Sequence, residues 1–183
     1  ADGRFVRRIG GDVLKTALGG LALSTDGRLY VTGFGPQVWI FRTADGAADG
    51  TLGGPDSGEG ALVEPVDVAL DAAGQIYVAD AGQATIEKFA PDGTHLLTFG
   101  GRGDGAGKFT SPRSVAVDAE GRVYVGLGDD FLIQRFAPDG SYLDAFGNAY
   151  ADESAWRIGG VAVDASGNVY ATQALSARVQ CFT

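Results

Sequence analysis

An all-β fold built from repeated antiparallel units is predicted by three features of the 183-residue sequence. First, one string returns four times, as "LALSTDGRLYV" from Leu21, "VALDAAGQIYV" from Val68, "VAVDAEGRVYV" from Val115 and "VAVDASGNVYA" from Val161. Second, apolar residues alternate with others inside each copy, and β-branched and aromatic types dominate, which is typical of strands. Third, no helical period of 3.6 residues is sustained anywhere. Short strands in repeated units of about 47 residues are the pattern of β-propeller blades.

A tight turn joins the first two strands of each unit. It ends in glycine in every copy, at a point where a chain reversal commonly requires a positive φ. These glycines are Gly27, Gly74, Gly121 and Gly167. A side chain that accepts backbone N–H bonds opens each turn, namely Ser24, Asp71, Asp118 and Asp164. Each unit therefore begins with a β-hairpin.

Two further strands complete the unit. The third is predicted at "QVWIF", "TIEKF", "FLIQRF" and "RVQCF", and the fourth at "THLLTFG" and "SYLDAFG". One tyrosine recurs on the second strand, and we expect it to pack between neighbouring blades with its hydroxyl at a wet edge. Its copies are Tyr30, Tyr77, Tyr124 and Tyr170.

The two ends of the chain complement each other in the repeat. Joined end to beginning they read "FTADGRFVRRIGG", which aligns with "FAPDGTHLLTFGG" from Phe89 to Gly101. We therefore expect Arg4–Ile9 to pair beside Arg178–Phe182 and to close a four-bladed ring that has no open sheet edge. The blades of this single domain, 1–183, then span about 20–54, 67–101, 114–147, and 160–183 plus 1–11. The alternatives are part of a larger six- to eight-bladed ring, or a ring made by two chains.

The linker and hairpin of the third unit carry a family resemblance. The stretch "FGGRGDGAGKFTSPRSVAVDAEGRVYV", Phe99–Val125, followed by "LIQRFAPDGSYLDAFG", resembles the NHL repeat. The resemblance covers essentially the whole chain in four copies and implies a β-propeller of four-stranded blades. NHL propellers commonly have six blades, so four copies are a departure from the family. Families with this fold include protein-binding modules, RNA-binding modules and a few enzymes, and fold alone does not choose among them.

Composition excludes several function classes. The formal net charge of −9 repels the phosphate backbone, so nucleic acid is not an expected partner. No run of about 18 apolar residues is present, so membrane insertion is not expected. The single cysteine, Cys181, excludes an intramolecular disulfide. Because the sequence contains no Met, we expect a processed chain and favour an extracellular or cell-envelope location, although the compartment stays open.

The sequence lacks the usual sets of catalytic residues. His95 is the only histidine and lies on a predicted fourth strand, whereas a zinc site needs three or four donors. Cys181 lies two units from His95, and neither Ser24 nor Ser114 has a nearby partner histidine. We therefore assign no catalytic residue, no metal ligand and no cofactor.

The loops between the second and third strands differ strongly from unit to unit. Variation on one face of a repeated scaffold is how repeat proteins build binding surfaces. We predict a non-catalytic scaffold that binds a protein or peptide through this loop face. The candidate binding residues are Phe34, Gln37, Asp80, Gln83, Asp129, Asp130 and Phe131 on the rim, with Asp67 and Arg113 nearer the axis.

Two alternatives to the binding scaffold stay open. Grouped carboxylates at the mouth of the ring would suit Ca²⁺ or Mg²⁺, as in a metal-assisted lyase or lactonase. A structural role is the other, with the chain acting as a self-associating subunit of a larger assembly.

Overall fold

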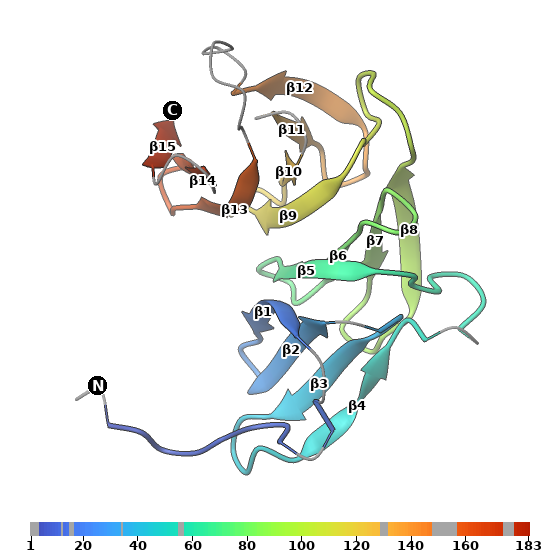
Figure 1. Ribbon diagram of the computed structural model, residues 1–183, viewed down its shortest axis with the longest axis vertical. Coiled ribbons are helices and arrows are strands. Elements are labelled where there is room, and N and C mark those ends of the chain that lie inside the picture. The colour runs from blue at the N-terminus through green and yellow to red at the C-terminus, as the bar shows by residue number, and fades with distance from the viewer. Residues whose placement is uncertain are drawn as a thin grey trace.

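The computed structural model describes residues 4–11, 13–14, 17–33, 35–54, 57–128, 132–147, 157–173 and 178–183. Within these ranges every regular element is a β-strand, and none of the described residues forms a helix suited in length and hydropathy to crossing a membrane. The strands form four antiparallel sheets, placed one after another around a common centre (Figure 1). The predicted all-β, four-bladed propeller architecture is confirmed.

The four sheets follow chain order. Blade 1 contains β1 (Leu18–Leu23), β2 (Arg28–Gly33), β3 (Val38–Arg42) and β4 (Ala48–Leu52). Blade 2 contains β5 (Pro65–Leu70), β6 (Ile76–Asp80), β7 (Thr85–Phe89) and β8 (His95–Gly100). Blade 3 contains β9 (Pro112–Val117), β10 (Val123–Leu127), β11 (Ile133–Phe136) and β12 (Tyr142–Phe146). Blade 4 contains the three strands β13 (Ile158–Val163), β14 (Val169–Gln173) and β15 (Arg178–Phe182).

The hairpin turns have the predicted chemistry. In blade 3, Asp118 accepts the backbone N–H groups of Glu120 and Arg122 at 3.0 and 2.8 Å, and Gly121 has a φ of 79°. The equivalent aspartates Asp71 and Asp164 accept the same pair of amides in their own turns. These aspartates are therefore turn residues.

The recurring tyrosine differs from expectation at its hydroxyl. In blade 3 the Tyr124 hydroxyl donates to Asp118 Oδ2 at 3.0 Å, and it is buried there instead of lying at a wet edge. Tyr77 and Tyr170 donate to Asp71 and Asp164 through equivalent bonds, of which the first is partly buried and the second is exposed. The carboxylate of the turn thus holds the tyrosine of the next strand.

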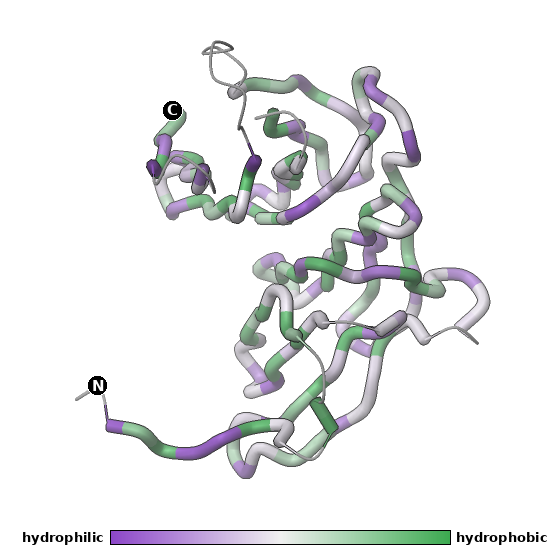
Figure 2. The backbone as a smooth tube through the Cα atoms, viewed as in Figure 1, coloured by the Kyte–Doolittle hydropathy of each residue, from purple (hydrophilic) through white to green (hydrophobic). Residues whose placement is uncertain are grey.

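Neighbouring blades bury one repeated type of interface. We call the side of a blade that carries the alanine of its first strand and the recurring tyrosine its forward face. We call the opposite side, which carries paired Val, Leu or Ile residues, its backward face. The forward face of each blade packs on the backward face of the next: Ala22 and Tyr30 on Val68, Ile76 and Val78; Ala69 and Tyr77 on Val115, Val123 and Val125; Ala116 and Tyr124 on Val161, Val163 and Val169. Figure 2 shows hydrophobic residues recurring along the strands of all four blades.

The expected closure of the ring is not found. Blade 4 has three strands among the described residues, and Arg4–Ile9 do not pair with β15. The N-terminal segment instead runs past β3 and β4, away from β15 (Figure 1). Blade 1 holds it there, because Arg7 Nη1 donates to Ala44 O at 2.7 Å and the side chain of Ile9 lies against Gly46.

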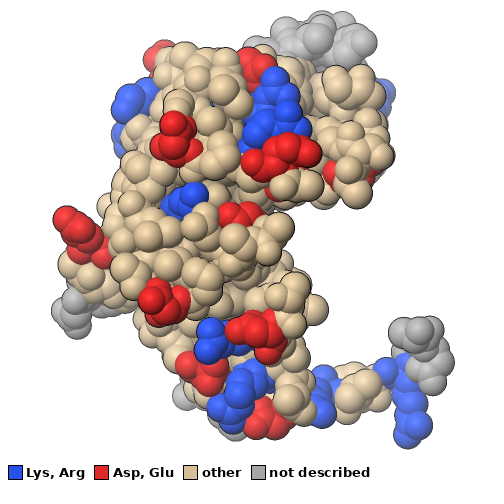
Figure 3. Space-filling view, turned by 180° about the vertical axis from the view of Figure 1, so that it is seen from behind, with Lys and Arg blue, Asp and Glu red and all other residues tan. Residues whose placement is uncertain are grey.

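Charged side chains on the blades are largely paired. In blade 1, Arg28 and Arg42 lie beside Asp26, Asp45 and Asp49. In blade 3, Arg122 and Arg135 pair with Asp118, Glu120 and Asp144. On the face in Figure 3, basic side chains over the blades accordingly lie next to acidic ones, whereas those of the projecting N-terminal segment do not.

Candidate functional site

A pocket lies at the centre of the arc of blades, where the first strands begin. Its volume is about 570 Å³. All four blades contribute to its lining: Ala17, Leu18, Gly19, Gly20, Gly33, Glu64, Pro65, Val66, Asp67, Arg113, Ser114, Gly159, Gly160 and Val161. The loops between second and third strands leave the blades at this same end, because Pro65 at the start of β5 pairs with Asp80 at the end of β6. The pocket thus lies on the predicted loop face, and we name it the axial pocket.

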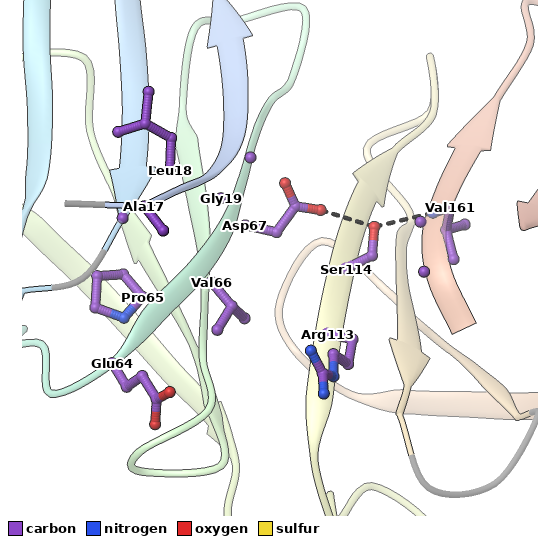
Figure 4. Close-up of a pocket in the computed structure, with 14 residues that line it drawn as sticks. Ala17, Leu18, Gly19, Glu64, Pro65, Val66, Asp67, Arg113, Ser114 and Val161 are labelled. Carbon is purple, nitrogen blue, oxygen red and sulfur yellow. Dashed lines mark hydrogen bonds between the residues drawn. The ribbon is translucent and has the colours of Figure 1, made fainter. Parts of the chain in front are cut away.

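Asp67 lies on β5 and faces β9 across the axial pocket (Figure 4). Its Oδ2 accepts the Ser114 hydroxyl at 2.7 Å and the backbone N–H of Val115 at 3.0 Å. Burial raises the pKa of the Asp67 carboxyl, and the hydrogen bonds from Ser114, Val115 and Val68 oppose that rise. Gly20 must be glycine here, since a side chain at that position would collide with the Asp67 carboxylate.

Ser114 connects three blades beside the pocket. Its hydroxyl donates to Asp67 in blade 2 and accepts the backbone N–H of Val161 in blade 4 at 2.9 Å (Figure 4). In blade 1, Thr32 makes the corresponding link by donating to Val66 O at 3.0 Å. These short polar side chains fix the relative positions of the first strands, so the wall of the pocket is preorganised.

Arg113 provides the guanidinium that is the basic group of the site. It is exposed at the pocket wall on β9, and its aliphatic part packs over Gly128. It forms no hydrogen bond or ion pair with any other described residue. Glu64 is exposed on the opposite wall (Figure 4). The pocket therefore offers a guanidinium with no partner among the described residues, and the two carboxylates of Glu64 and Asp67, around a floor that is largely backbone.

Asp80 does not lie on the open rim. Its side chain is fully buried, and its two oxygens accept the backbone N–H groups of Val63, Glu64 and Gln83 at 2.7 to 3.1 Å. Gln83 is exposed, but its amide donates to Ala61 O at 2.7 Å and to Asp80. This correction has a simple reason: Asp80 anchors the segment that leads into β5, so it positions Glu64 and is not itself available to a ligand.

Four of the predicted rim residues, Phe34, Asp129, Asp130 and Phe131, lie outside the described residues. Gln37 is half-buried before β3 and is not among the pocket residues. Of the predicted set, the structure therefore brings Asp67 and Arg113 together at the axis.

Sequence reasoning missed Glu64 and the glycines of the pocket floor. Gly19, Gly20, Gly159 and Gly160 occupy the starts of the first strands, where blades 2 and 3 carry larger residues. The signal was available, because "LGG" and "IGG" stand where the other copies read "PVD" and "PRS". Blades 1 and 4 carry glycine pairs at these positions, whereas blades 2 and 3 carry residues with side chains. This pattern predicts an opening on one side of the axis.

His95 has a structural environment. Its Nε2 lies 2.9 Å from Oε2 of the buried Glu87 and 3.1 Å from Oγ1 of Thr98. Because the same ring nitrogen faces both partners, the three groups do not form the relay of a nucleophilic triad.

The carboxylates of the described residues are spread over the blades. No group of three or more His, Cys, Asp or Glu side chains among these residues is arranged to hold an ion. The oxygens of Asp80 are used by backbone amides, and Oδ2 of Asp67 is used by Ser114 and Val115.

No protein-family model matches the sequence, and the search of curated proteins found no match. Solved structures do match in fold. The chain superposes on a protein in a crystallised nidogen–laminin complex with a TM-score of 0.73 and 23% identity, over 91% of this chain and 60% of that one.

Two lyase structures are also similar. A streptogramin B lyase matches with a TM-score of 0.67 and 12% identity, over 91% of this chain and 54% of that one. Virginiamycin B lyase from Staphylococcus aureus matches with a TM-score of 0.65 and 12% identity, over 92% of this chain and 56% of that one. The chain thus spans little more than half the length of these solved proteins, and at these identities the likeness concerns the fold.

Proposed function

We propose that the protein is a non-catalytic, NHL-like propeller that binds a protein or peptide segment at its axial pocket. The observation that carries the proposal is the exposed guanidinium of Arg113, which faces Glu64 and Asp67 across a cavity of about 570 Å³ without a partner among the described residues. That volume lies in the usual range of binding sites. The fixed wall of first strands lowers the ordering cost of binding.

The lining of the pocket favours a peptide over a rigid apolar ligand. Its glycines leave a shallow, partly polar surface, on which Glu64, Asp67 and Arg113 are the charged groups. Arg113 pairs best with a carboxylate, because its planar fork donates two parallel hydrogen bonds. The segment bound is therefore one that presents an Asp, a Glu or a C-terminal carboxylate to Arg113.

The experiment measures binding of fluorescein-labelled peptides of about ten residues, in acidic, neutral and basic sets, by fluorescence anisotropy. We expect the acidic set to bind, and Arg113→Ala to weaken it by about tenfold or more, in line with about 1.5–3 kcal/mol for a charge-assisted hydrogen bond. Arg42→Ala is the matched control, since Arg42 is exposed at the opposite end of blade 1, beyond the reach of the pocket. Equal binding of all three sets, or equal loss in both variants, would rule the proposal out.

The outer rim can be tested with the same peptides. We expect alanine at Phe34, Asp129 and Phe131 to weaken peptide capture if the segment extends from the axial pocket over the loop face. Unchanged capture would confine the site to the pocket.

A lyase or lactonase activity is the second candidate. It is favoured by the burial-raised pKa of the Asp67 carboxyl in the pocket, which is typical of acid–base residues, and by the two lyases among the similar folds. Incubation with streptogramin B in the presence of Mg²⁺ or Ca²⁺ tests it. Loss of intact compound that is abolished in Asp67→Asn supports this candidate. No turnover, together with no metal binding by calorimetry, removes it.

A further inference from the structure

Positive charge collects on the linker between β8 and β9. Arg102 and Lys108 lie on this linker, Arg113 lies at the start of β9, and all three residues are exposed. None of them forms an ion pair with a described carboxylate, unlike the arginines of the hairpins and third strands in blades 1 and 3. Asp104 is the one acidic residue between them, so this stretch carries an excess of positive charge in a chain whose formal net charge is −9.

Arg102 and Lys108 are anchored across the end of blade 2 that opens on the axial pocket. Arg102 Nη2 donates to Gly82 O at 3.3 Å, in the loop between β6 and β7. Lys108 Nζ donates to Gly100 O at 2.7 Å, at the end of β8. Both carbonyls lie at the pocket end, because the end of β6 pairs with the starts of β5 and β7, and the start of β7 pairs with the end of β8.

The three cations therefore lie in a row from the axis to the outer edge of the blade, and we call this row the basic track. Arg113 lines the axial pocket (Figure 4), Arg102 reaches the loop after the second strand, and Lys108 reaches the end of the fourth strand. Neighbouring strands are about 4.8 Å apart, so the row extends over three strand spacings, or about 14 Å. The chain itself allows this span, because the four residues from Phe109 to Arg113 cover at most about 14 Å.

The linker of the preceding blade has the opposite charge. Between β4 and β5 the described residues include the exposed Glu59 and Glu64, and no Lys or Arg. Glu64 ends this linker on the pocket wall opposite Arg113 (Figure 4). Because like charges repel, a negatively charged segment that enters the axial pocket is directed away from this linker and over the basic track.

We propose that the basic track binds an extended acidic segment of a protein partner, with acidic residues at alternate positions. This inference rests on the proposed peptide-binding function of the axial pocket. An extended chain rises about 3.3 Å per residue and presents every second side chain on the same face. Acidic residues at a first, third and fifth position therefore span about 13 Å, which matches the row from Arg113 through Arg102 to Lys108. Carboxylates in these places form charge-assisted hydrogen bonds with the three cations.

The spacing can be tested with fluorescein-labelled peptides of about ten residues. Two peptides of identical composition carry three glutamates each, at alternate positions in one and at consecutive positions in the other, and a third peptide carries a single glutamate. Fluorescence anisotropy should show the alternating peptide binding at least about threefold more tightly than the consecutive one, because only the alternating peptide reaches all three cations. The preference should shrink between about 0.05 and 0.5 M NaCl, since salt screens exposed charges.

Two matched double variants separate the track from the general charge of this face. Arg102→Gln with Lys108→Gln removes two charges of the track, and should abolish the preference for the alternating peptide while changing the affinity of the single-glutamate peptide by less than about twofold. Arg157→Gln with Arg178→Gln is the control, because it removes two exposed charges at the pocket end of blade 4. The control should keep the preference.

Equal affinity for the alternating and consecutive peptides would overturn the basic track. If both peptides then still lose affinity in Arg113→Ala, the axial pocket remains the binding site and only the track is wrong. If Arg113→Ala changes neither affinity, the proposed function fails as well. A preference that survives in the Arg102→Gln, Lys108→Gln variant, or that disappears equally in the control, also contradicts the proposal.

Discussion

Asp118 shows how a residue that looks like a site candidate becomes part of the scaffold. Besides the two turn amides, its carboxylate accepts Arg122 Nε at 2.6 Å and the Tyr124 hydroxyl at 3.0 Å. Burial disfavours the charged carboxylate, but the hydrogen bonds from Arg122 and Tyr124 outweigh it, so the pKa of Asp118 lies below its usual value. The carboxylate thus stabilises both the turn and the strand that follows it.

We expect Asp118→Asn to lower the free energy of unfolding by about 2 kcal/mol at pH 7, because hydrogen bonds to a charged group are worth about 1.5–3 kcal/mol. A carboxyl whose pKa is lower in the folded protein stabilises it above the unfolded pKa, and that contribution is lost as the pH falls through the folded value. The difference between wild type and variant should therefore shrink below about pH 4. Urea denaturation from pH 7 to pH 3 measures it.

Glu120→Gln is the control for this experiment, since Glu120 pairs with the same Arg122 but is exposed. It should change stability by less than about 0.5 kcal/mol. If the loss of unfolding free energy in Asp118→Asn did not vary with pH, the hydrogen-bond geometry of the side chain, and not its charge, would determine the effect.

Asp118 was assigned to its turn from the repeat alone, since its partners lie within six residues. Asp80 was placed on the rim and is buried, because its partners Val63 and Glu64 lie 17 and 16 residues away. The residues around such an aspartate do not indicate whether a distant segment of the chain buries it.

At the scale of elements, the linkers from blade 1 to blade 2 and from blade 2 to blade 3 each depend on one glycine. Gly100 ends β8 with a φ of 100°, and the ring of Phe109 packs where its side chain would be. Phe109 is fully buried between blades 2 and 3. Gly53 and Leu62 repeat this arrangement between blades 1 and 2.

Gly100→Ala should lower the free energy of unfolding by about 2–4 kcal/mol, because it combines a left-handed backbone with overpacking of Phe109. Gly105→Ala in the same linker meets no atom within 4 Å and has no positive φ, so it should be close to neutral. Chemical denaturation of the two variants compares them. Equal effects would mean that the linker, and not the contact with Phe109, is sensitive to alanine.

The blade was predictable as an element because strand alternation, turn residues and the interface tyrosine all recur within one repeat. The missing fourth strand of blade 4 was not predictable in the same way. The repeat predicts a fourth strand at Arg4–Ile9, but the predicted pairing of that strand with β15 is wrong, because the repeat does not determine which third strand lies beside it.

At the scale of the whole molecule, the four blades form an arc around the axial pocket (Figure 1). All four blades line the pocket, from Gly19 in blade 1 to Gly160 in blade 4. The shape of the pocket therefore depends on the angle at which each blade packs on the next.

The sequence by itself determined the blade: its strands, its turns and the residues that face a neighbouring blade. It could do so because these depend on contacts within one repeat of about 47 residues, or on the same contact made again in the next repeat. Tertiary structure alone decided where the N-terminal strand lies, that Asp80 is buried, and that Asp67, Glu64 and Arg113 share a pocket. Those features depend on the angle between successive blades. Small differences in packing change that angle, and no local sequence pattern determines it.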